Sequence, residues 1–145
     1  MTSMKISDVA EGDVLGPLTV PVDRERLLAY AAASGDHNRI HWDSQVARSV
    51  GLPDVIAHGM WTMGSAIEVL GPLAADPGSI RHYSTKFVSP VVVPSSGAVE
   101  ITVVGEVKKV TACDVMIELE VRCAQEKVLS RTRVVLASDQ EKAAN

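Results

Sequence analysis

Residues 59–70, GMWTMGSAIEVL, are the stretch that most constrains the fold. Apolar residues recur here at the i, i+3, i+4, i+7 spacing of one helix face: Met60, Met63, Gly64, Ile67 and Leu70. Further apolar residues lie on the other faces, and a helix that is apolar on most sides is usually buried. Gly71 and Pro72 follow and end or bend the helix. We therefore predict a buried helix over residues 59–70, with its methionines packed in the core.

Beyond residue 79 the apolar period changes from about 3.6 residues to two. In residues 115–123, VMIELEVRC, apolar positions alternate with polar ones, as in a strand with one buried and one solvated face. Similar patterns predict strands over residues 80–89, 99–110 and 127–137. Because consecutive strands joined by short turns usually pair, we expect an antiparallel sheet that curls around the helix at 59–70.

The first half of the chain is interpreted as helix and loop, so the fold class is α+β rather than alternating βαβ units. Asp23 can cap a helix over residues 24–34, which Gly35 ends. Its apolar face consists of Leu27, Leu28, Ala31 and Ala32. Asp43 or Ser44 can cap a short helix that stops at Gly51.

Composition excludes several classes of protein. The 145 residues suit one domain over residues 1–145, and we expect residues 139–145 to be a flexible tail. The net charge is −4 and the basic residues are scattered, so we expect no nucleic-acid partner. No apolar run approaches the roughly 20 residues of a membrane span, and no signal peptide is recognisable. Two cysteines outside any CxxC spacing favour a cytoplasmic location.

Polar, titratable residues gather in residues 34–64 beside glycines and helix ends. Asp36 and His41 lie five residues apart across a loop, so each could reach one water molecule from a different side. A carboxylate and an imidazole are well suited to activate water near neutral pH. The alternative is structural: Asp36 caps a turn and His41 is a loop histidine with its hydrogen bonds satisfied.

The dipeptide His58-Gly59 precedes the predicted central helix. Backbone N–H groups at a helix N-terminus lack intrahelical acceptors and favour negative charge, which is how a backbone oxyanion hole is made. Gly59 has no Cβ, so a ligand could approach closely. Alternatively, Gly59 only lets the chain turn into the helix.

Other chemistries fit poorly. No HExxH or Cys/His ligand set is present, so we expect no metal, and no GxSxG or nucleotide-binding loop occurs. Cys113 and Cys123 lack a neighbouring histidine that would activate a thiol. His37 and His82 are interpreted as surface or packing residues. We expect no cofactor.

Three ordered motifs carry a family resemblance. SGDHNRIHWD at residues 34–43 resembles the hydratase motif of the MaoC-like, R-specific enoyl-thioester hydratases and dehydratases, in which Ser/Thr-Gly-Asp-x-Asn-Pro precedes a hydrophobic residue and His. IAHGMWTMG at 56–64 and KFVSPVVVP at 86–94 continue the resemblance, which spans about residues 6–137. Within the family, the chain most resembles the catalytic β-subunit of actinobacterial (3R)-hydroxyacyl-ACP dehydratases.

This resemblance implies the hot-dog fold, a curled antiparallel sheet around a long central helix. It also implies reversible hydration of trans-2-enoyl thioesters to (R)-3-hydroxyacyl thioesters. Asp36 and His41 would hold and deprotonate the water, and the Gly59 N–H would stabilise the thioester oxygen. Asn38 would orient the His41 loop, and His58 would join Gly59 in binding substrate. The implied partners are an acyl-CoA or acyl-ACP thioester and a second hot-dog subunit, identical or related.

One departure concerns the motif proline, which is Arg39 here. Arg39 removes the restraint that proline places on the backbone, adds an N–H group and brings a charge near the expected site. Two alternatives therefore stay open beside the hydratase. One is a non-catalytic acyl-thioester-binding subunit of a heteromeric dehydratase, and the other is a hot-dog thioesterase.

Overall fold

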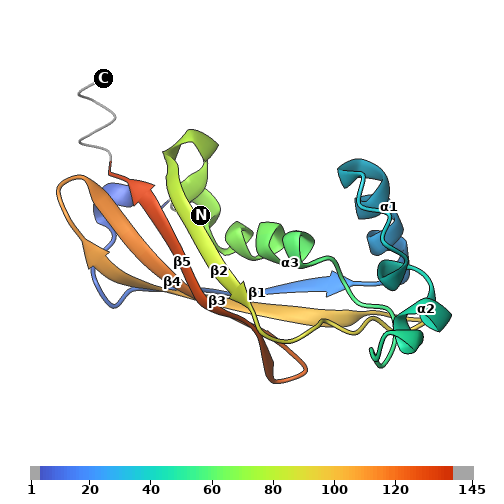
Figure 1. The fold of residues 1–145 in the computed structure, drawn as a ribbon. Coiled ribbons are helices and arrows are strands. Elements are labelled where there is room, and N and C mark those ends of the chain that lie inside the picture. The colour runs from blue at the N-terminus through green and yellow to red at the C-terminus, as the bar shows by residue number, and fades with distance from the viewer. Residues whose placement is uncertain (1–3, 139–145) are drawn as a thin grey trace.

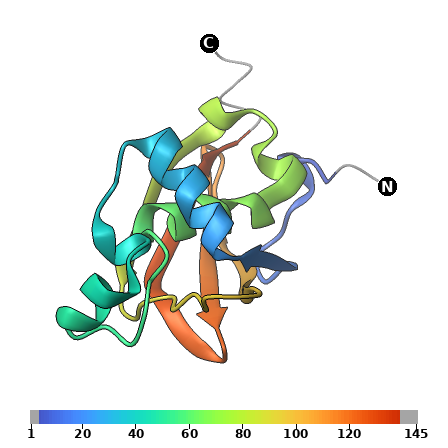
Figure 2. The same cartoon turned by 90° about the vertical axis from the view of Figure 1, so that its right-hand side faces the viewer.

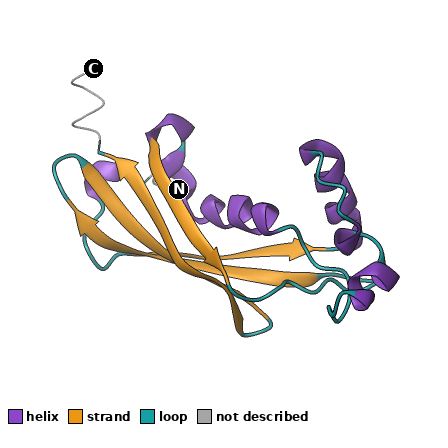
Figure 3. Cartoon of the chain, viewed as in Figure 1, coloured by secondary structure: helices purple, strands orange, loops and turns teal. Residues whose placement is uncertain are grey.

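The computed structural model describes residues 4–138 and shows one sheet with α1 and α3 on the same side of it and α2 beyond one end (Figures 1 and 3). The strands are β1 (Val14–Val22), β2 (Ile80–Phe87), β3 (Val99–Val110), β4 (Asp114–Cys123) and β5 (Glu126–Ala137). The α-helices are α1 (Arg24–Ser34), α2 (Ser44–Ser49) and α3 (Gly59–Ala66). Short 3-10 helices occupy Ile6–Asp8, Arg39–His41, Ile67–Ala74 and Pro77–Ser79. The tail predicted over residues 139–145 lies outside the described range.

The sheet order is β1-β3-β4-β5-β2, with every neighbouring pair antiparallel. Helix α3 lies across one face of this sheet, as the two perpendicular views show (Figures 1 and 2). The predicted α+β arrangement is therefore confirmed. In β4 the residues predicted to face inward are all buried: Val115, Ile117, Leu119, Val121 and Cys123. Within residues 4–138, no helix combines the length and apolar character that crossing a bilayer requires.

The structure corrects the interpretation of the first half as helix and loop, because β1 is a strand of nine residues. Pro17 and Pro21 obscured it, since proline cannot donate to a sheet ladder. The strand tolerates them because it lies at the edge of the sheet, pairs only with β3, and has an irregular register between Leu15 and Leu18.

The expectation that consecutive strands pair is correct for β3–β4–β5 and wrong for β2, whose partner is β5. Strand β2 ends at Phe87 at one edge of the sheet, and residues 88–98 carry the chain to β3, which lies next to the opposite edge. This connection is not a free turn. Val91 and Val93 are buried in the core, and an isolated antiparallel bridge joins Ile56 to Val92.

The predicted central helix is shorter than residues 59–70, because α3 ends at Ala66 and a 3-10 segment follows. That segment is broken at Gly71, where φ is +49°. The buried residues of 59–70 are Trp61, Thr62, Ala66, Val69 and Leu70, so only Leu70 of the predicted face is buried. Met60 is 61% exposed and Met63 is half-buried, so neither is packed in the core as predicted. Periodicity alone did not distinguish the faces, since apolar residues occur on most of them.

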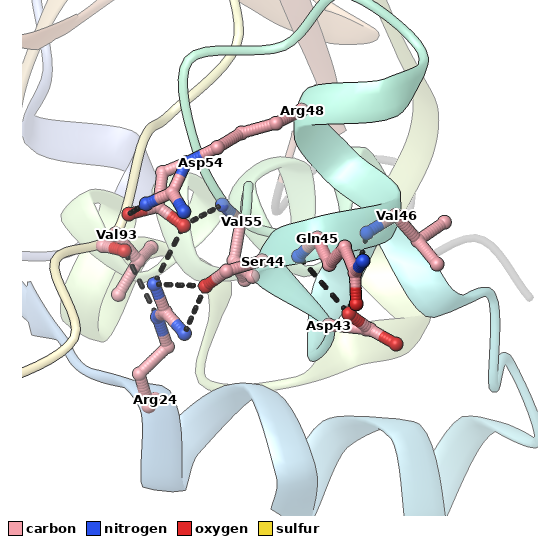
Figure 4. Close-up of polar contacts among 9 residues, drawn as sticks. All are labelled: Arg24, Asp43, Ser44, Gln45, Val46, Arg48, Asp54, Val55 and Val93. Carbon is pink, nitrogen blue, oxygen red and sulfur yellow. Dashed lines mark hydrogen bonds and ion pairs between the residues drawn. The ribbon is translucent and has the colours of Figure 1, made fainter.

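Both predicted helix starts are confirmed. The Asp23 carboxylate accepts a hydrogen bond from the Arg26 N–H, and Gly35 ends α1 in the left-handed conformation. Asp43, rather than Ser44, caps α2 by accepting from the Gln45 and Val46 N–H groups (Figure 4). The predicted apolar face of α1 is only half correct, because Leu27 and Ala31 are buried whereas Leu28 and Ala32 are exposed.

Candidate active site

His41 is buried at the end of the Arg39–His41 turn, with 7% of its surface exposed. Its Nδ1 lies 2.8 Å from the carbonyl oxygen of Ile56. A carbonyl oxygen can only accept a hydrogen bond, so this contact assigns the proton to Nδ1. The other ring nitrogen, Nε2, then presents a lone pair, which is the form of histidine that accepts a proton.

Asp36 faces that lone pair. Its Oδ1 accepts a hydrogen bond from the Asn38 N–H, and its Oδ2 lies 3.9 Å from His41 Nε2. This gap is too long for a direct hydrogen bond, yet one water molecule can lie about 2.8 Å from both atoms. The structure thus brings together the two residues that were selected as a water-activating pair. Half of the Asp36 side chain is exposed, so its carboxylate is accessible to solvent.

Asn38 shapes the turn between these two residues. Its side-chain oxygen accepts a hydrogen bond from the Ile40 N–H at 3.2 Å and so begins the turn that carries His41. Arg39, in the place of the motif proline, contacts residues that lie close to it in the sequence. Its guanidinium pairs with Asp43 at 2.6 Å and lies 5.6 Å from the Trp42 ring centroid. The charge that Arg39 adds is therefore balanced by Asp43.

His58 packs behind His41 and is 1% exposed. The two rings are stacked, with centroids 3.8 Å apart, and Tyr30 contacts the His58 ring at 4.7 Å. His58 Nε2 lies 3.1 Å from the Asp36 carbonyl oxygen and so ties the Asp36 backbone to the start of α3. Burial lowers the pKa of His58 below its usual 6.5, and the adjacent His41 acts in the same direction. His58 is therefore neutral at physiological pH.

Gly59 begins α3 without a side-chain cap at His58. The hydrogen bond from the Thr62 N–H to the His58 carbonyl oxygen is the first of the helix, so the preceding N–H groups have no intrahelical acceptor. A Cβ at Gly59 would lie 3.0–3.3 Å from ring atoms of Phe87. The position therefore has no room for a side chain unless Phe87 moves.

A cavity of about 310 Å³ connects His41 with Gly59. Its remaining lining is largely apolar: Ile56, Ala57, Thr62, Phe87, Val88, Ser89, Pro90, Val91, Val128 and Leu129. Among the described lining residues only His41 is titratable. Sequence reasoning did not select the apolar wall contributed by β2 and β5. One signal for it was available, because Phe87 is the only phenylalanine in the chain and lies within the strand predicted over residues 80–89.

Asp36, His41 and His58 each have a side-chain atom that could bind a metal ion, and these three atoms lie within 4.8 Å of one another. Histidine ligands place a metal about 2.0–2.1 Å from nitrogen, in the plane of the ring. The planes of His41 and His58 are inclined by only 23° in a stack, so their lone pairs cannot converge on one ion. One nitrogen of each ring is also engaged with a backbone carbonyl. The geometry therefore suits proton transfer better than metal ligation.

The other histidines and the cysteines lie outside this cluster. His37 and His82 are exposed, in agreement with their interpretation as surface or packing residues. Cys113 is exposed in the β3–β4 turn and Cys123 is buried at the end of β4.

The fold and site together define an α+β domain of the hot-dog class, with a histidine–carboxylate pair near the N-terminus of its central helix. The chain belongs to the MaoC-like domain family, since residues 6–124 match the family model described as "MaoC like domain". A solved structure described as a MaoC-like dehydratase has a TM-score of 0.88 and 29% identity, covering 94% of this chain and 43% of that one.

Two curated relatives carry named activities. A stretch of 72 residues is 43% identical to 3-hydroxyacyl-thioester dehydratase X of Mycobacterium tuberculosis, covering 49% of this chain and 24% of that protein. A stretch of 80 residues is 35% identical to the peroxisomal enoyl-CoA hydratase 2 of Arabidopsis thaliana, covering 52% of this chain and 26% of that protein. The chain thus spans about a quarter of the length of either relative. It is a member of a family that contains hydratases and dehydratases.

Proposed function

We propose that this protein catalyses the reversible hydration of trans-2-enoyl thioesters to (R)-3-hydroxyacyl thioesters. The observation that carries the proposal is the pair formed by His41 Nε2 and Asp36 Oδ2, 3.9 Å apart, with His41 also among the residues that line an apolar cavity. The names of the dehydratase and hydratase relatives support the same reaction class.

The nucleophile is a water molecule held between His41 and Asp36. His41 accepts its proton at Nε2 as the oxygen bonds to Cβ of the enoyl group, while the Asp36 carboxylate orients the water and balances the imidazolium charge. A proton from this pair is then delivered to Cα. The addition consumes one water and leaves both residues as they began. In reverse, the same groups remove the Cα proton and release the 3-hydroxyl group as water.

Negative charge develops on the thioester oxygen when water attacks Cβ. In this proposal the Gly59 N–H and the positive end of α3 stabilise that oxygen, which is supported by the fact that Gly59 and His41 line the same cavity. Asn38 supports the reaction by starting the His41 turn, and His58 by holding the Asp36 backbone. No step of this reaction calls for a metal or a redox cofactor.

The carrier is coenzyme A or an acyl carrier protein, and its bulk remains outside a cavity of about 310 Å³. We further propose that the domain works as a pair of hot-dog subunits, identical or related. The two cysteines, which form no disulfide, agree with a reducing compartment such as the cytoplasm.

The test is the ultraviolet absorbance of the conjugated enoyl thioester after protein is added. Short and long enoyl-CoA and enoyl-ACP substrates are compared with wild-type protein, Asp36→Asn and His41→Ala. We expect absorbance to fall with wild type and to remain with both variants. No change on any substrate, with folded protein and a related subunit present, would contradict the proposal.

Two further readouts separate the alternatives. A thioesterase would release free thiol, which a thiol reagent detects and hydration does not produce. For a non-catalytic subunit, a heteromeric complex carrying Asp36→Asn would keep full activity.

A further inference from the structure

Arg24, the first residue of α1, joins three segments that are far apart in the sequence (Figure 4). Its Nε donates to the Val93 carbonyl oxygen at 2.9 Å, and its Nη2 binds Asp54 Oδ1 at 3.0 Å. Both terminal nitrogens also lie 3.4–3.5 Å from the Ser44 hydroxyl at the start of α2. The guanidinium therefore holds α1, α2, the loop at Asp54 and the connection at Val93 in one arrangement.

The residues after Asp54 lie between this guanidinium and the proposed catalytic histidine. On one side, the Val55 carbonyl accepts from the Val93 N–H and the Ala57 N–H donates to the Val91 carbonyl, both at 2.9 Å. On the other side, the Ile56 N–H donates to Ile40 at 3.2 Å, and the Ile56 carbonyl accepts from His41 Nδ1 at 2.8 Å. The backbone of residues 55–57 thus connects Asp54 and Val93 to the His41 ring, so that a shift of either residue displaces the ring.

We infer that Arg24 and Asp54 are positioning residues for His41, because they fix the Ile56 carbonyl that sets its tautomer and ring orientation. This inference rests on the proposed hydration for its effect on rate, although the effect on His41 itself does not. A guanidinium suits the task because its planar fork binds a carboxylate and a carbonyl at once, which a lysine ammonium cannot do in the same geometry. A partner behind a reactive histidine commonly controls its tautomer.

Arg48 provides a matched comparison on the same carboxylate. It binds Asp54 Oδ2 at 3.2 Å, carries the same charge and is 61% exposed, whereas the Arg24 side chain is 22% exposed. Arg48 makes no contact with the Val93 connection among the hydrogen bonds of the described residues. The Ser44 hydroxyl, the Val55 N–H and both guanidiniums hold the pKa of Asp54 below its usual range. The carboxylate is therefore charged wherever the enzyme would be assayed.

The first experiment compares steady-state hydration by wild type, Arg24→Lys, Arg24→Gln and Arg48→Gln. We expect kcat to fall about 10- to 100-fold in both Arg24 variants, with KM changing less than about threefold, because the substrate contacts remain while His41 is misplaced. Arg48→Gln stays within about twofold of wild type, since a surface ion pair contributes little. Thermal unfolding accompanies each assay, so that rates refer to folded protein.

The second experiment reads His41 without catalysis, by ¹⁵N NMR of the imidazole nitrogens in the full chain. We expect wild type and Arg48→Gln to show a protonated Nδ1 and an unprotonated Nε2, and Arg24→Lys to show a mixture of tautomers. Unchanged His41 signals and unchanged kcat in folded Arg24→Lys would overturn the inference. If no variant hydrates any enoyl thioester but the tautomer still shifts, the proposed function fails while the positioning of His41 by Arg24 stands.

Discussion

Strands β3–β5 and residues 34–58, which we term the site segment, are held together by different forces. In the strands, an alternating set of apolar residues is buried, and Ile101, Val103, Ile117 and Val121 have no exposed surface. In the site segment, short turns depend on side chains bonded to backbone: Asp36 to Asn38, Asn38 to Ile40, and His41 to Ile56. The strands are held mainly by buried apolar surface, whereas the turns of the site segment are held by individual hydrogen bonds between side chains and backbone.

This difference indicates that the sheet carries most of the buried apolar area, whereas the proposed chemistry lies in the site segment. Losing a buried side chain in the sheet removes many contacts and destabilises the fold. Losing a polar atom in the site segment changes the placement of a proton and leaves the core intact. Substitutions of buried strand residues are therefore expected to lower the free energy of unfolding more than the rate. Substitutions of the proposed catalytic residues are expected to lower the rate more than the free energy of unfolding.

The largest expected effect is a loss of hydration rate without a loss of stability. Asp36→Asn keeps an oxygen that can accept from the Asn38 N–H but removes the charge beside His41, so we expect hydration to slow about 10²- to 10⁴-fold. The melting temperature stays close to wild type, because the Asp36 side chain is half exposed. Kinetic assays and thermal unfolding of the same sample check both statements. A fall in melting temperature that matched the lost activity would erase the contrast between the regions.

The next effect is a loss of unfolding free energy without a loss of rate. Ile117→Ala leaves a cavity in β4 and is expected to cost about 2–5 kcal/mol of unfolding free energy, measured by urea titration. The rate per folded molecule remains within about twofold of wild type. Glu118→Ala, at the adjacent exposed position, is the control and stays within about 0.5 kcal/mol. Equal destabilisation by the two variants would show that burial does not decide the cost.

A pH dependence of stability is expected from His58, a buried residue of the site segment. Because its pKa is lowered in the folded state, the unfolded chain binds a proton more tightly, and acidification through pH 6.5 favours unfolding. Unfolding free energies measured from pH 7.5 to 5 should fall for wild type and fall less steeply for His58→Gln. His82→Gln, at an exposed position of β2, is the matched control. Identical slopes in wild type and His58→Gln would contradict the assignment of a neutral, buried His58.

The smallest effect concerns the cap of α2. Asp43→Ala removes the acceptor of the Gln45 and Val46 N–H groups and is expected to cost about 1 kcal/mol. Asp43→Asn keeps a capping oxygen and loses only the charge that pairs with the exposed Arg39, so we expect a smaller loss than for Ala. Chemical denaturation resolves the two variants. Equal losses for Asn and Ala, which both lose the ion pair, would mean that the ion pair, and not the cap, holds this turn.

The central sheet and the local ends of helices could be predicted from the sequence. Alternation in residues 115–123 predicts which side chains of β4 are buried, because strand geometry sends neighbouring side chains to opposite faces. Asp23 and Asp43 were found as caps because each bonds to N–H groups two or three residues away. The site residues Asp36, His41 and Gly59 could be selected for the same reason, since their motifs occupy one stretch of chain.

Only the tertiary structure decided the rest. The prolines of β1 are tolerated because the sheet places that strand at an edge, and the partner of β2 depends on where residues 88–98 cross. The face of α3 that meets the sheet, the apolar wall at Phe87 and the bond between Arg24 and Asp54 also join segments distant in sequence. Periodicity and capping report on contacts within a few residues. Distant contacts depend on how the whole chain fills its core, so the sequence by itself singled out the groups that we propose carry the chemistry, and the tertiary structure decided what holds them in place.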